Sequence, residues 1–396
     1  MSPSPVAFVV QRYGRDVTGG SEALARAVAE RLGALHEVTV FTTCARDYVT
    51  WRNELPAGEE DVAGVRVRRF PVEEERDLAA FNAFAEPLYA RETTRREELE
   101  FLRLQGPVVP SLVEALRAEK DRFAAVVFFT YLYYPTVLGL EAAPERSVLV
   151  PTTHDEPPLR FSIYREAFAR PRAFAFLTPA ERALVEERFG TFGRPAAVAG
   201  MGVDVSPPGE VGAFRARHGL ERPYALYAGR IDAGKGCAAL LAHHESYRRR
   251  AARDAADLVL IGRLAMEEPR QQGVRWLGFL SEEEKAAAMA GAVAVVCPSP
   301  YESLSIVLLE GLALGTPGLV SAASPVLREH CLRSNAGLFY GDGDEYAEAL
   351  DLLVREGALR AALGANGRRY VDEEYRWSVV LERWAGLLAA VAREGP

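Results

Sequence analysis

Two glutamates, eight positions apart, are the side chains of this chain whose type and spacing point most clearly to chemistry. Glu302 and Glu310 follow the apolar run 292–297, which has the composition of a buried strand. If a helix begins between them, Glu302 lies on the loop at the carboxyl end of the strand and Glu310 lies about two turns inside the helix. Ligands of open α/β sheets bind at such strand ends, so both carboxylates are candidates for substrate contact.

The helix start after Glu302 would also offer donors to an anionic group. The backbone amides of Ser303, Leu304 and Ser305 are expected at the helix N-terminus, where unpaired N–H groups and the helix dipole favour a phosphate. Glu302 is then placed to accept hydrogen bonds from sugar hydroxyls, and Glu310 from a ribose diol. The alternative is that Glu302 caps the helix and Glu310 is solvated, but the apolar residues on both sides of Glu310 favour a polar partner for it.

A glycine-rich turn with two cations follows the strand-like run 224–228. Gly229 to Lys235 reads G-x-x-x-x-G-K, the start of a P-loop, but Gly236 stands where a Ser or Thr must ligate Mg²⁺, which argues against a P-loop NTPase. Arg230 and Lys235 remain as two cations that can hold a diphosphate and stabilise it as it leaves. A surface turn with incidental basic residues is the alternative; however, lysine is rare here, with only three among 47 basic residues.

The first half of the chain contains a second glycine turn. Gly19 and Gly20 lie between an opening strand and its helix, where two glycines let the backbone come close to an anionic or hydroxyl-rich ligand. The alternative is a helix capped by Ser21, with the glycines serving only the turn. This turn is not a dinucleotide-binding fingerprint, because no G-x-G-x-x-G occurs there.

A lone histidine follows another strand-like run, 147–150. His154 is flanked by the carboxylates Asp155 and Glu156 in a proline-containing loop, and histidine is the side chain that most readily changes charge near neutral pH. Because His154 lies at the end of a strand, the sequence supports a catalytic role and a structural role equally. The residue types leave open whether its ring or its backbone carbonyl faces a substrate.

Two other patterns have structural explanations. Asp342-Gly-Asp344 spells the D-x-D of metal-dependent transferases, but it precedes a helix, and Asp344 is expected to be the N-cap. Aromatic residues gather in 128–134 and 161–164; they could stack on an acceptor ring, but packing between sheet and helix explains most of them. The four cysteines are scattered singly, without the spacing of a zinc site or a disulfide framework.

The elements that must position these residues form two regions. Strand-like runs alternate with segments of helical periodicity up to residue 150, and the same alternation begins again at residue 224. The Gly- and Pro-rich stretch 193–212 between them is typical of an interdomain connection. We therefore expect two parallel α/β domains with a boundary near residue 200.

Composition agrees with a folded two-domain protein. The chain has 396 residues, 49% hydrophobic and 26% charged. Its net charge of −8 repels phosphate backbones and anionic bilayers, so nucleic acid is not an expected partner, while peripheral association with a membrane stays open. The N-terminus lacks a signal-peptide pattern, and the uncharged stretch 123–140 is interrupted by proline and glycine, so we expect a cytoplasmic protein.

These motifs resemble those of the retaining, metal-independent glycosyltransferases of family 4, which have the GT-B fold of two Rossmann-like domains facing across a cleft. The E-x7-E element of Glu302 and Glu310, followed by Gly-Thr-Pro at 315–317, is the most specific match. The resemblance implies that Glu302 touches the donor sugar, that Glu310 touches the nucleotide ribose, and that Arg230 and Lys235 bind the donor diphosphate. Many members have E-x-F-G, whereas this chain has Glu-Ser-Leu-Ser at 302–305, a change that keeps the backbone donors.

The resemblance extends over nearly the whole chain. Gly19-Gly20 matches the N-terminal glycine loop of the family, His154-Asp155 its cleft histidine, and residues 202–204 the entry of the linker into the second domain. It implies an acceptor-binding domain at 1–199, a nucleotide-sugar-binding domain at 200–375, and a C-terminal helix at 376–396 that returns to the N-terminal domain.

The implied activity is transfer of a hexose-type sugar from a UDP- or GDP-sugar to the hydroxyl of an unknown glycan, lipid-linked or small-molecule acceptor, with no cofactor and no metal. The predicted catalytic residues are His154, Arg230, Lys235 and Glu302. The predicted substrate-binding residues are Gly19, Gly20, Asp155, Ser303, Leu304, Ser305 and Glu310. A GT-B epimerase or phosphorylase and a non-catalytic nucleotide-sugar-binding protein remain open alternatives.

Overall fold

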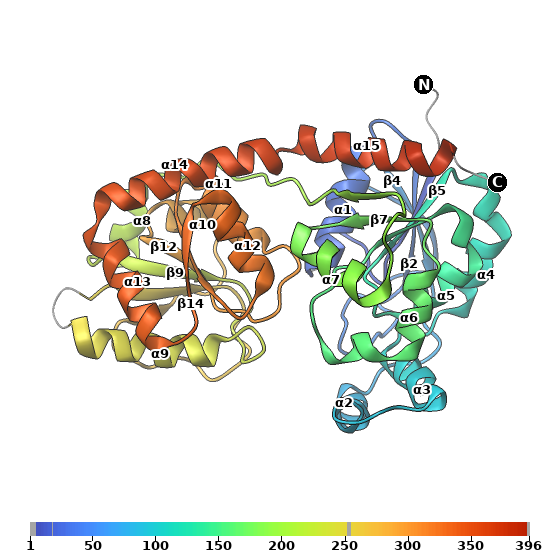
Figure 1. Cartoon of the computed structure of the whole chain (residues 1–396), viewed down its shortest axis with the longest axis horizontal. Coiled ribbons are helices and arrows are strands. Elements are labelled where there is room, and N and C mark those ends of the chain that lie inside the picture. The colour runs from blue at the N-terminus through green and yellow to red at the C-terminus, as the bar shows by residue number, and fades with distance from the viewer. Residues whose placement is uncertain (1–4, 18, 252–254, 394–396) are drawn as a thin grey trace. The chain divides into compact units, whose positions relative to one another are not determined.

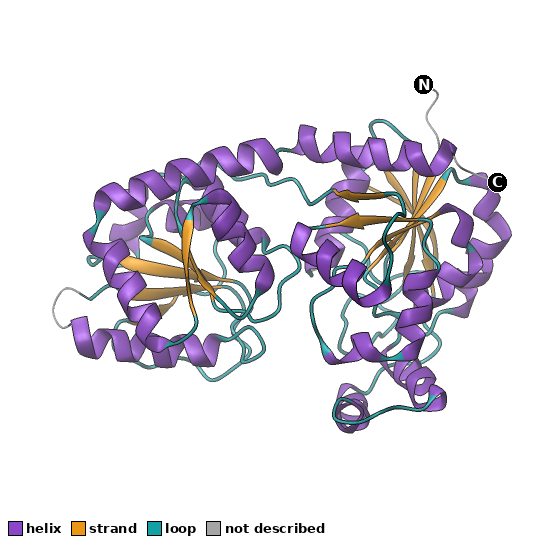
Figure 2. Ribbon diagram, viewed as in Figure 1, coloured by secondary structure: helices purple, strands orange, loops and turns teal. Residues whose placement is uncertain are grey.

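The computed structural model describes residues 5–17, 19–251 and 255–393, and the chain divides into two units. Unit 1 consists of Met1–Met201 together with Val380–Pro396, and unit 2 consists of Gly202–Val379. In each unit a mainly parallel sheet is covered by helices (Figures 1 and 2). The chain thus changes unit after residues 201 and 379, whereas the sequence predicted boundaries after 199 and 375.

The sheet of unit 1 has eight strands in the order β3-β4-β2-β1-β5-β6-β7-β8. All of its pairs are parallel except β3 with β4. The strands are β1 (Val6–Val9), β2 (Val38–Thr43), β3 (Gly58–Val62), β4 (Val65–Phe70), β5 (Ala125–Phe129), β6 (Ser147–Val150), β7 (Ala173–Phe176) and β8 (Ala196–Val198). The central strands are buried along their whole length, as expected for parallel strands with helices on both faces.

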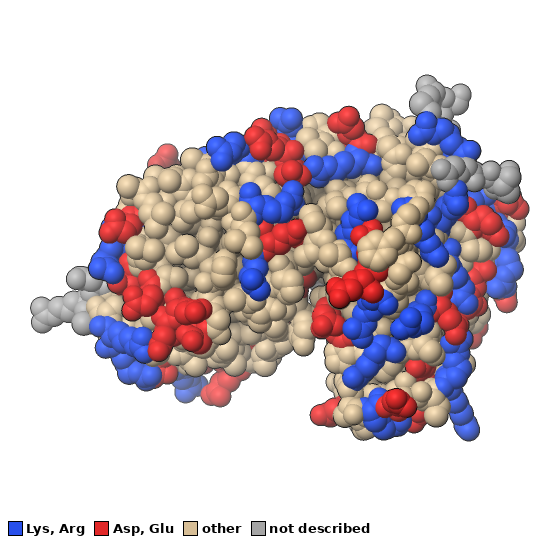
Figure 3. Space-filling model, in the orientation of Figure 1, with Lys and Arg blue, Asp and Glu red and all other residues tan. Residues whose placement is uncertain are grey.

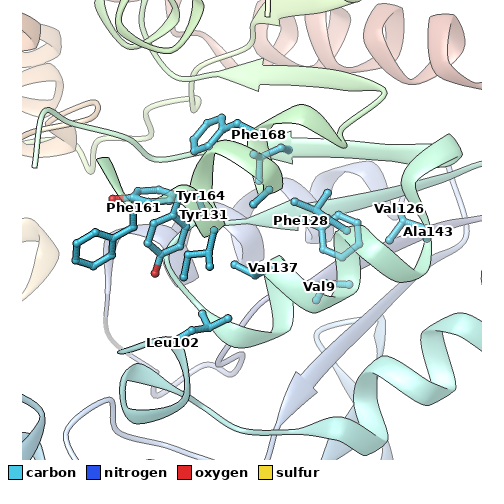
Figure 4. Close-up of a cluster of buried hydrophobic side chains, with 14 of the residues drawn as sticks. Val9, Leu102, Val126, Phe128, Tyr131, Val137, Ala143, Phe161, Tyr164 and Phe168 are labelled. Carbon is cyan, nitrogen blue, oxygen red and sulfur yellow. The ribbon is translucent and has the colours of Figure 1, made fainter. Parts of the chain in front are cut away.

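Seven helices precede the crossing into unit 2 in the described part of unit 1. They are α1 (Gly20–Leu32), α2 (Leu78–Leu88), α3 (Arg95–Gln105), α4 (Pro110–Glu119), α5 (Tyr134–Ala142), α6 (Ser162–Ala169) and α7 (Pro179–Phe189). The core between sheet and helices contains many aromatic rings, including Phe128, Tyr131 and Tyr164 (Figure 4). The packing explanation for this aromatic cluster is therefore confirmed.

The sheet of unit 2 has six parallel strands in the order β11-β10-β9-β12-β13-β14. The strands are β9 (Tyr224–Ala228), β10 (Asp257–Ile261), β11 (Val274–Trp276), β12 (Ala294–Cys297), β13 (Gly318–Ser321) and β14 (Gly337–Tyr340). The helices are α8 (Val211–Arg217), α9 (Cys237–Ala251), α10 (Glu282–Ala290), α11 (Ile306–Leu314), α12 (Pro325–Ser334), α13 (Gly343–Arg355) and α14 (Gly357–Glu374).

Strand order reverses once in each sheet. In unit 2 the chain builds β10 and β11 on one side of β9 and then returns to build β12, β13 and β14 on the other. In unit 1 the corresponding reversal lies between β1 and β5. At such a point two neighbouring loops diverge at the carboxyl ends of the strands, and this is where open α/β sheets bind ligands.

The last helix, α15 (Trp377–Arg393), joins unit 1 for most of its length. Val380, Trp384, Leu387 and Val391 are buried and spaced to lie on one face, and the Trp384 ring lies 6.5 Å from that of Phe8 on β1. The predicted return of the C-terminal helix to the N-terminal domain is confirmed.

The two chain crossings are tied together within unit 2. The amide of Val203 donates to the carbonyl oxygen of Tyr375 over 2.9 Å, and Trp377 Nε1 donates to Asp204 Oδ2 over 2.9 Å. A Cβ on Gly202 would clash with the ring of Trp377, so the incoming segment lies directly against the outgoing one.

The structure corrects two helix caps. The N-cap of α13 is Asp342, whose Oδ1 accepts from the amides of Asp344 and Glu345, each over 2.9 Å; Asp344 itself lies in the first turn. At α1 the N-cap is Gly19, and Ser21 lies inside the helix. In both places the N-cap lies two residues earlier than the sequence suggested, because helix boundaries depend on backbone geometry that sequence patterns set only loosely.

Charge is intermixed on the surface. Lys and Arg side chains lie beside Asp and Glu over the face drawn in Figure 3. Within the segment around α3, Arg91 pairs with Glu97 and Arg103 with Glu100, so charges of opposite sign are paired locally there. None of the described helices is long and apolar enough to cross a membrane.

Candidate functional site

The predicted donor-binding residues of unit 2 lie on two neighbouring loops. Residues 229–236 follow β9 and residues 298–305 follow β12, and these strands pair in parallel where strand order reverses. The structure brings the loops into contact, because Lys235 Nζ donates a hydrogen bond to Glu302 Oε1 over 2.8 Å. The Lys235 side chain is 37% exposed and that of Glu302 17% exposed, so a ligand can reach the pair.

A glycine permits the close approach of the two loops. Gly236 has a φ of 77°, and a Cβ there would clash with the carbonyl oxygen of Pro298. A larger residue would separate the β9 loop from the β12 loop. The glycine that breaks the P-loop pattern is therefore required by the packing of this site.

Arg230, the second predicted cation, begins the β9 loop. Its side chain pairs with Asp232, whose Oδ1 accepts a hydrogen bond from the amide of Lys235 over 2.8 Å. Tyr227 Oη donates to the carbonyl oxygen of Arg230 over 2.6 Å and fixes the backbone. Arg230 thus pairs with Asp232 and Lys235 with Glu302, and a bound diphosphate would share the cations with these carboxylates.

The corner between β12 and α11 presents three backbone donors. The helix begins at Ile306, so Ser303, Leu304 and Ser305 precede it rather than form its first turn as expected. Their amides donate no hydrogen bond within the described part of the chain. Ser305 has a φ of 63°, a left-handed conformation that is costly for a residue with a Cβ and that concentrates at functional sites.

His330, on α12, supports this corner and was not predicted. Its Nε2 lies 2.8 Å from the carbonyl oxygen of Leu304, and its Nδ1 lies 3.0 Å from Tyr370 Oη. Burial lowers the pKa of His330 to about 4, so the ring is neutral at physiological pH, with Nε2 donating to the carbonyl. A lone histidine in an amphipathic helix carries no sequence signal for this role.

Glu310 lies inside α11 and does not face bulk water. Its side chain is 12% exposed, and Lys285 Nζ on α10 donates to Glu310 Oε1 over 3.0 Å. Lys285 Nζ also contacts Glu282 Oε2 at 2.7 Å. Burial raises the pKa of Glu310, and the Lys285 charge opposes that rise. The sequence predicted a polar partner for Glu310, but nothing in it identified Lys285 as that partner.

The glycine turn of unit 1 lies over a buried ion pair. Arg12 Nη2 and Glu22 Oε1 are 2.5 Å apart, and both side chains are almost fully buried. A Cβ on Gly19 would clash with the Glu22 carboxylate, which explains the first glycine. Apart from its chain neighbours and its own helix, no described residue comes within 4 Å of a Cβ built on Gly20, so the backbone there is open to a ligand.

His154 is held by a hydrogen-bonded carboxylate. His154 Nε2 lies 3.3 Å from Glu156 Oε2, and the buried Tyr131 donates from Oη to Glu156 Oε1 over 2.7 Å. The sequence placed Glu156 beside the histidine but gave no sign of the tyrosine behind it, because Tyr131 follows a different strand. The network fixes the ring of His154 through the aromatic core.

The loop that carries His154 is itself strained and anchored. Thr130 and Thr152, at the ends of β5 and β6, have φ of 65° and 53°, and their hydroxyls lie 3.1 Å apart. The buried Glu181 accepts from the amides of Thr153 and Leu177, each over 2.6 Å, and burial raises its pKa to about 7. Glu181 is a second supporting residue that the sequence did not reveal.

The remaining unit 1 candidate points elsewhere. The carboxylate of Asp155 is 73% exposed and lies 3.8 Å from Arg188 Nη1 on α7. Gly19 and His154 follow β1 and β6, which are separated in the sheet by β5. Unit 1 thus presents two neighbouring but distinct loops.

A cavity of about 700 Å³ lies at the opposite, amino-terminal edge of the unit 1 sheet and includes four arginines. Arg194 donates to the carbonyl oxygens at the end of α6, Arg170 pairs with Glu141 at 2.9 Å, and Arg182 pairs with Glu186 at 2.8 Å. These arginines serve the local structure, and we assign the cavity no ligand.

Comparisons with known proteins agree with this geometry. Residues 212–370 match the family model "Glycosyl transferases group 1". Alpha-maltose-1-phosphate synthase of Mycobacterium tuberculosis (strain ATCC 25618 / H37Rv) is 27% identical over 195 residues, 44% of this chain and 50% of the relative. D-inositol 3-phosphate glycosyltransferase of Frankia alni is 31% identical over 237 residues, 54% of this chain and 58% of the relative. The chain spans about half the length of the curated relatives it matches.

A solved structure extends the likeness to both units. HepE of Anabaena, in complex with UDP and glucose, has a TM-score of 0.70 with 14% identity and covers 98% of this chain and 100% of that one. The fold is therefore GT-B, as predicted. Within that class, residues 212–370 match the glycosyl transferases group 1, and the relatives just described are glycosyltransferases or synthases by name.

Proposed function

We propose that the protein is a retaining glycosyltransferase that moves a hexose-type sugar from a UDP- or GDP-sugar to an acceptor hydroxyl without a metal ion. The observation that carries the proposal is the contact between Lys235 and Glu302, made where the strand order of unit 2 reverses and beside three amides that donate to no other described residue. That arrangement combines cationic, backbone and carboxylate groups, which a diphosphate joined to a sugar requires.

The leaving diphosphate is the group these residues suit best. Arg230 and Lys235 provide positive charge, and the amides of Ser303, Leu304 and Ser305 provide donors that need no reorganisation as charge develops. In the proposed reaction these groups replace the divalent ion that other transferases use. Glu302 then accepts from hydroxyls of the donor sugar, and Glu310 from the ribose.

Support for a nucleotide sugar also comes from the structural neighbour, whose complex contains UDP and glucose. Neither the base nor the sugar is encoded in the side chains of this site. In the proposed reaction unit 1 binds the acceptor, with the backbone at Gly20 open to a ligand and with His154 and Asp155 as candidate contacts. The four cysteines are free and buried, which supports the proposed cytoplasmic setting.

The first test is a binding and transfer assay on two variants. Lys235→Ala and Glu302→Ala are expected to lower kcat/KM by about 10²- to 10³-fold, because each removes a group that stabilises the departing diphosphate or positions the sugar. Binding is measured first by thermal shift with UDP, GDP, UDP-glucose and GDP-mannose, since a ligand of the native state raises its melting temperature. Transfer is then measured with and without EDTA, and we expect no difference.

Lys120→Ala is the matched control, because Lys120 is a lysine of unit 1 whose ion-pair partner, within the part of the chain that the structure describes, is Glu145 at 3.6 Å. It should behave like the wild type. Wild-type rates in both site variants would refute the proposal. Donor breakdown without an acceptor, or phosphate-dependent cleavage of a glycoside, would show an epimerase or phosphorylase; binding with no reaction would show a non-catalytic nucleotide-sugar-binding protein.

A further inference from the structure

Lys285 joins two helices of unit 2 at the residue predicted to bind ribose. It lies on α10, 24% exposed, and its ammonium contacts Glu310 on α11 at 3.0 Å and the exposed Glu282 at 2.7 Å. Glu310 Oε2 has no hydrogen-bond partner among the described residues, so only one of its two oxygens is engaged. The contact leaves an acceptor oxygen available beside a fixed positive charge.

The choice of lysine at this position matters chemically. The chain uses arginine for all but three of its 47 basic residues, yet the residue facing Glu310 is a lysine. An ammonium is a compact charge that meets a carboxylate through one oxygen, whereas a guanidinium is a planar fork that tends to bind both oxygens. An arginine at 285 would therefore compete with a diol for Glu310 Oε2.

The lysine also keeps Glu310 useful as an acceptor. Burial favours the neutral form of the Glu310 carboxyl, and the positive charge of Lys285 favours the ionised form. The negative charge of Glu282 also favours the neutral form, so it adds to the effect of burial. A protonated carboxyl would lose acceptor strength and would no longer bind two vicinal hydroxyls well.

We propose that Lys285 is a positioning residue that holds Glu310 through one oxygen, so that the other oxygen accepts hydrogen bonds from the vicinal diol of a ribonucleotide. The inference rests on the proposed function of the same site. An ion pair that only stabilised the packing of α10 against α11 would serve equally well with lysine or arginine. It would also have no effect on the preference for a ligand with a diol over one without.

The test measures binding alone, with UDP and GDP compared against their 2′,3′-dideoxy analogues by calorimetry. For the wild type we expect the dideoxy analogue of the better-bound nucleotide to bind about 10- to 100-fold more weakly, the worth of hydrogen bonds to a charged group. Lys285→Arg and Lys285→Met should each reduce the ratio of the two dissociation constants, dideoxy analogue to ribonucleotide, to less than about threefold. The main cause should be weaker binding of the ribonucleotide. Glu310→Gln provides the reference for loss of the charged acceptor.

Glu282→Gln is the matched control, because it removes the exposed partner of Lys285 and leaves Glu310 in place; it should keep the wild-type ratio. A wild-type ratio in either Lys285 variant would overturn the inference. If Lys285→Met fails to fold, Lys285→Arg keeps the charge and decides alone. Absence of any nucleotide binding by the folded wild type would instead refute the proposed function.

Discussion

At the scale of single residues, the two cations and two glutamates named from spacing lie on the loops and helix expected of them. Lys235 meets Glu302, and Glu310 is shielded from bulk solvent. What spacing could not supply is the partner of each residue, since Lys285, His330 and Tyr131 come from segments far away in the chain. Their positions depend on how the elements pack against one another, which local sequence patterns do not predict.

Gly236 leads to a prediction about the P-loop alternative. Gly236→Ser restores the consensus hydroxyl of a P-loop, yet its Cβ would clash with the Pro298 carbonyl at a φ of 77°. We expect nucleotide binding to fall at least about tenfold, because the β9 and β12 loops must separate. Calorimetric titration of the variant and an ATPase assay with Mg²⁺ check this; a gain of Mg²⁺-dependent ATP hydrolysis would contradict it.

His330 leads to a prediction about pH. Because burial lowers its pKa from the ordinary 6.5 to about 4, the unfolded chain binds a proton in that interval and the folded chain does not. Stability is therefore lost as pH falls from 6.5 towards 4, by about 3 kcal/mol from this residue. His330→Gln should weaken that dependence, as measured by denaturant unfolding across the interval.

His244 is the matched control for His330. It is buried in the core of unit 2 beside Tyr346, and burial lowers its pKa to about 3. His244→Gln should also weaken the acid dependence, but only His330→Gln should weaken nucleotide binding, because only His330 contacts the corner at Leu304. Equal loss of binding in the two variants would count against a role of His330 at the site.

At the scale of elements, the sequence predicts strands better than the corners between them. Buried parallel strands such as β9 and β12 appear as continuous apolar runs, and both were found where expected. The corner before α11 was predicted as a helical turn, but the left-handed Ser305 delays the helix by several residues. Serine is not a residue type from which a left-handed backbone conformation can be predicted, so only the structure reveals it.

The caps show the same limit on a smaller scale. Asp342 and Asp344 both suit an N-cap, and the composition around them does not decide between the two. The backbone places Asp342 in extended geometry and makes it the cap. The identity of an element was thus predictable from its residue types, while its first residue was set by the fold.

At the scale of the whole molecule, Trp384 leads to the last prediction. It is a large buried side chain by which α15 packs on unit 1, and its indole nitrogen is buried with no hydrogen-bond partner among the described residues. Trp384→Ala should destabilise unit 1 by about 3 to 5 kcal/mol, whereas Trp384→Phe should cost less because it keeps a ring and removes an unpaired donor. Differential scanning calorimetry measures both.

The predicted donor residues all belong to unit 2, so neither Trp384 variant should change nucleotide affinity at a temperature where unit 1 remains folded. Calorimetric titration with UDP and GDP checks this second part. A matching loss of affinity in Trp384→Ala would show that donor binding depends on the packing of α15.

The paired crossings at Val203 and Tyr375 make unit 2 an insertion within unit 1, with its two ends fastened side by side. Insertions with adjacent ends can be exchanged as a cassette, because the host chain closes again across the gap. Under the proposed function, recognition of the activated sugar and recognition of its recipient can therefore diverge independently in evolution, each on its own core, while the junction stays the same.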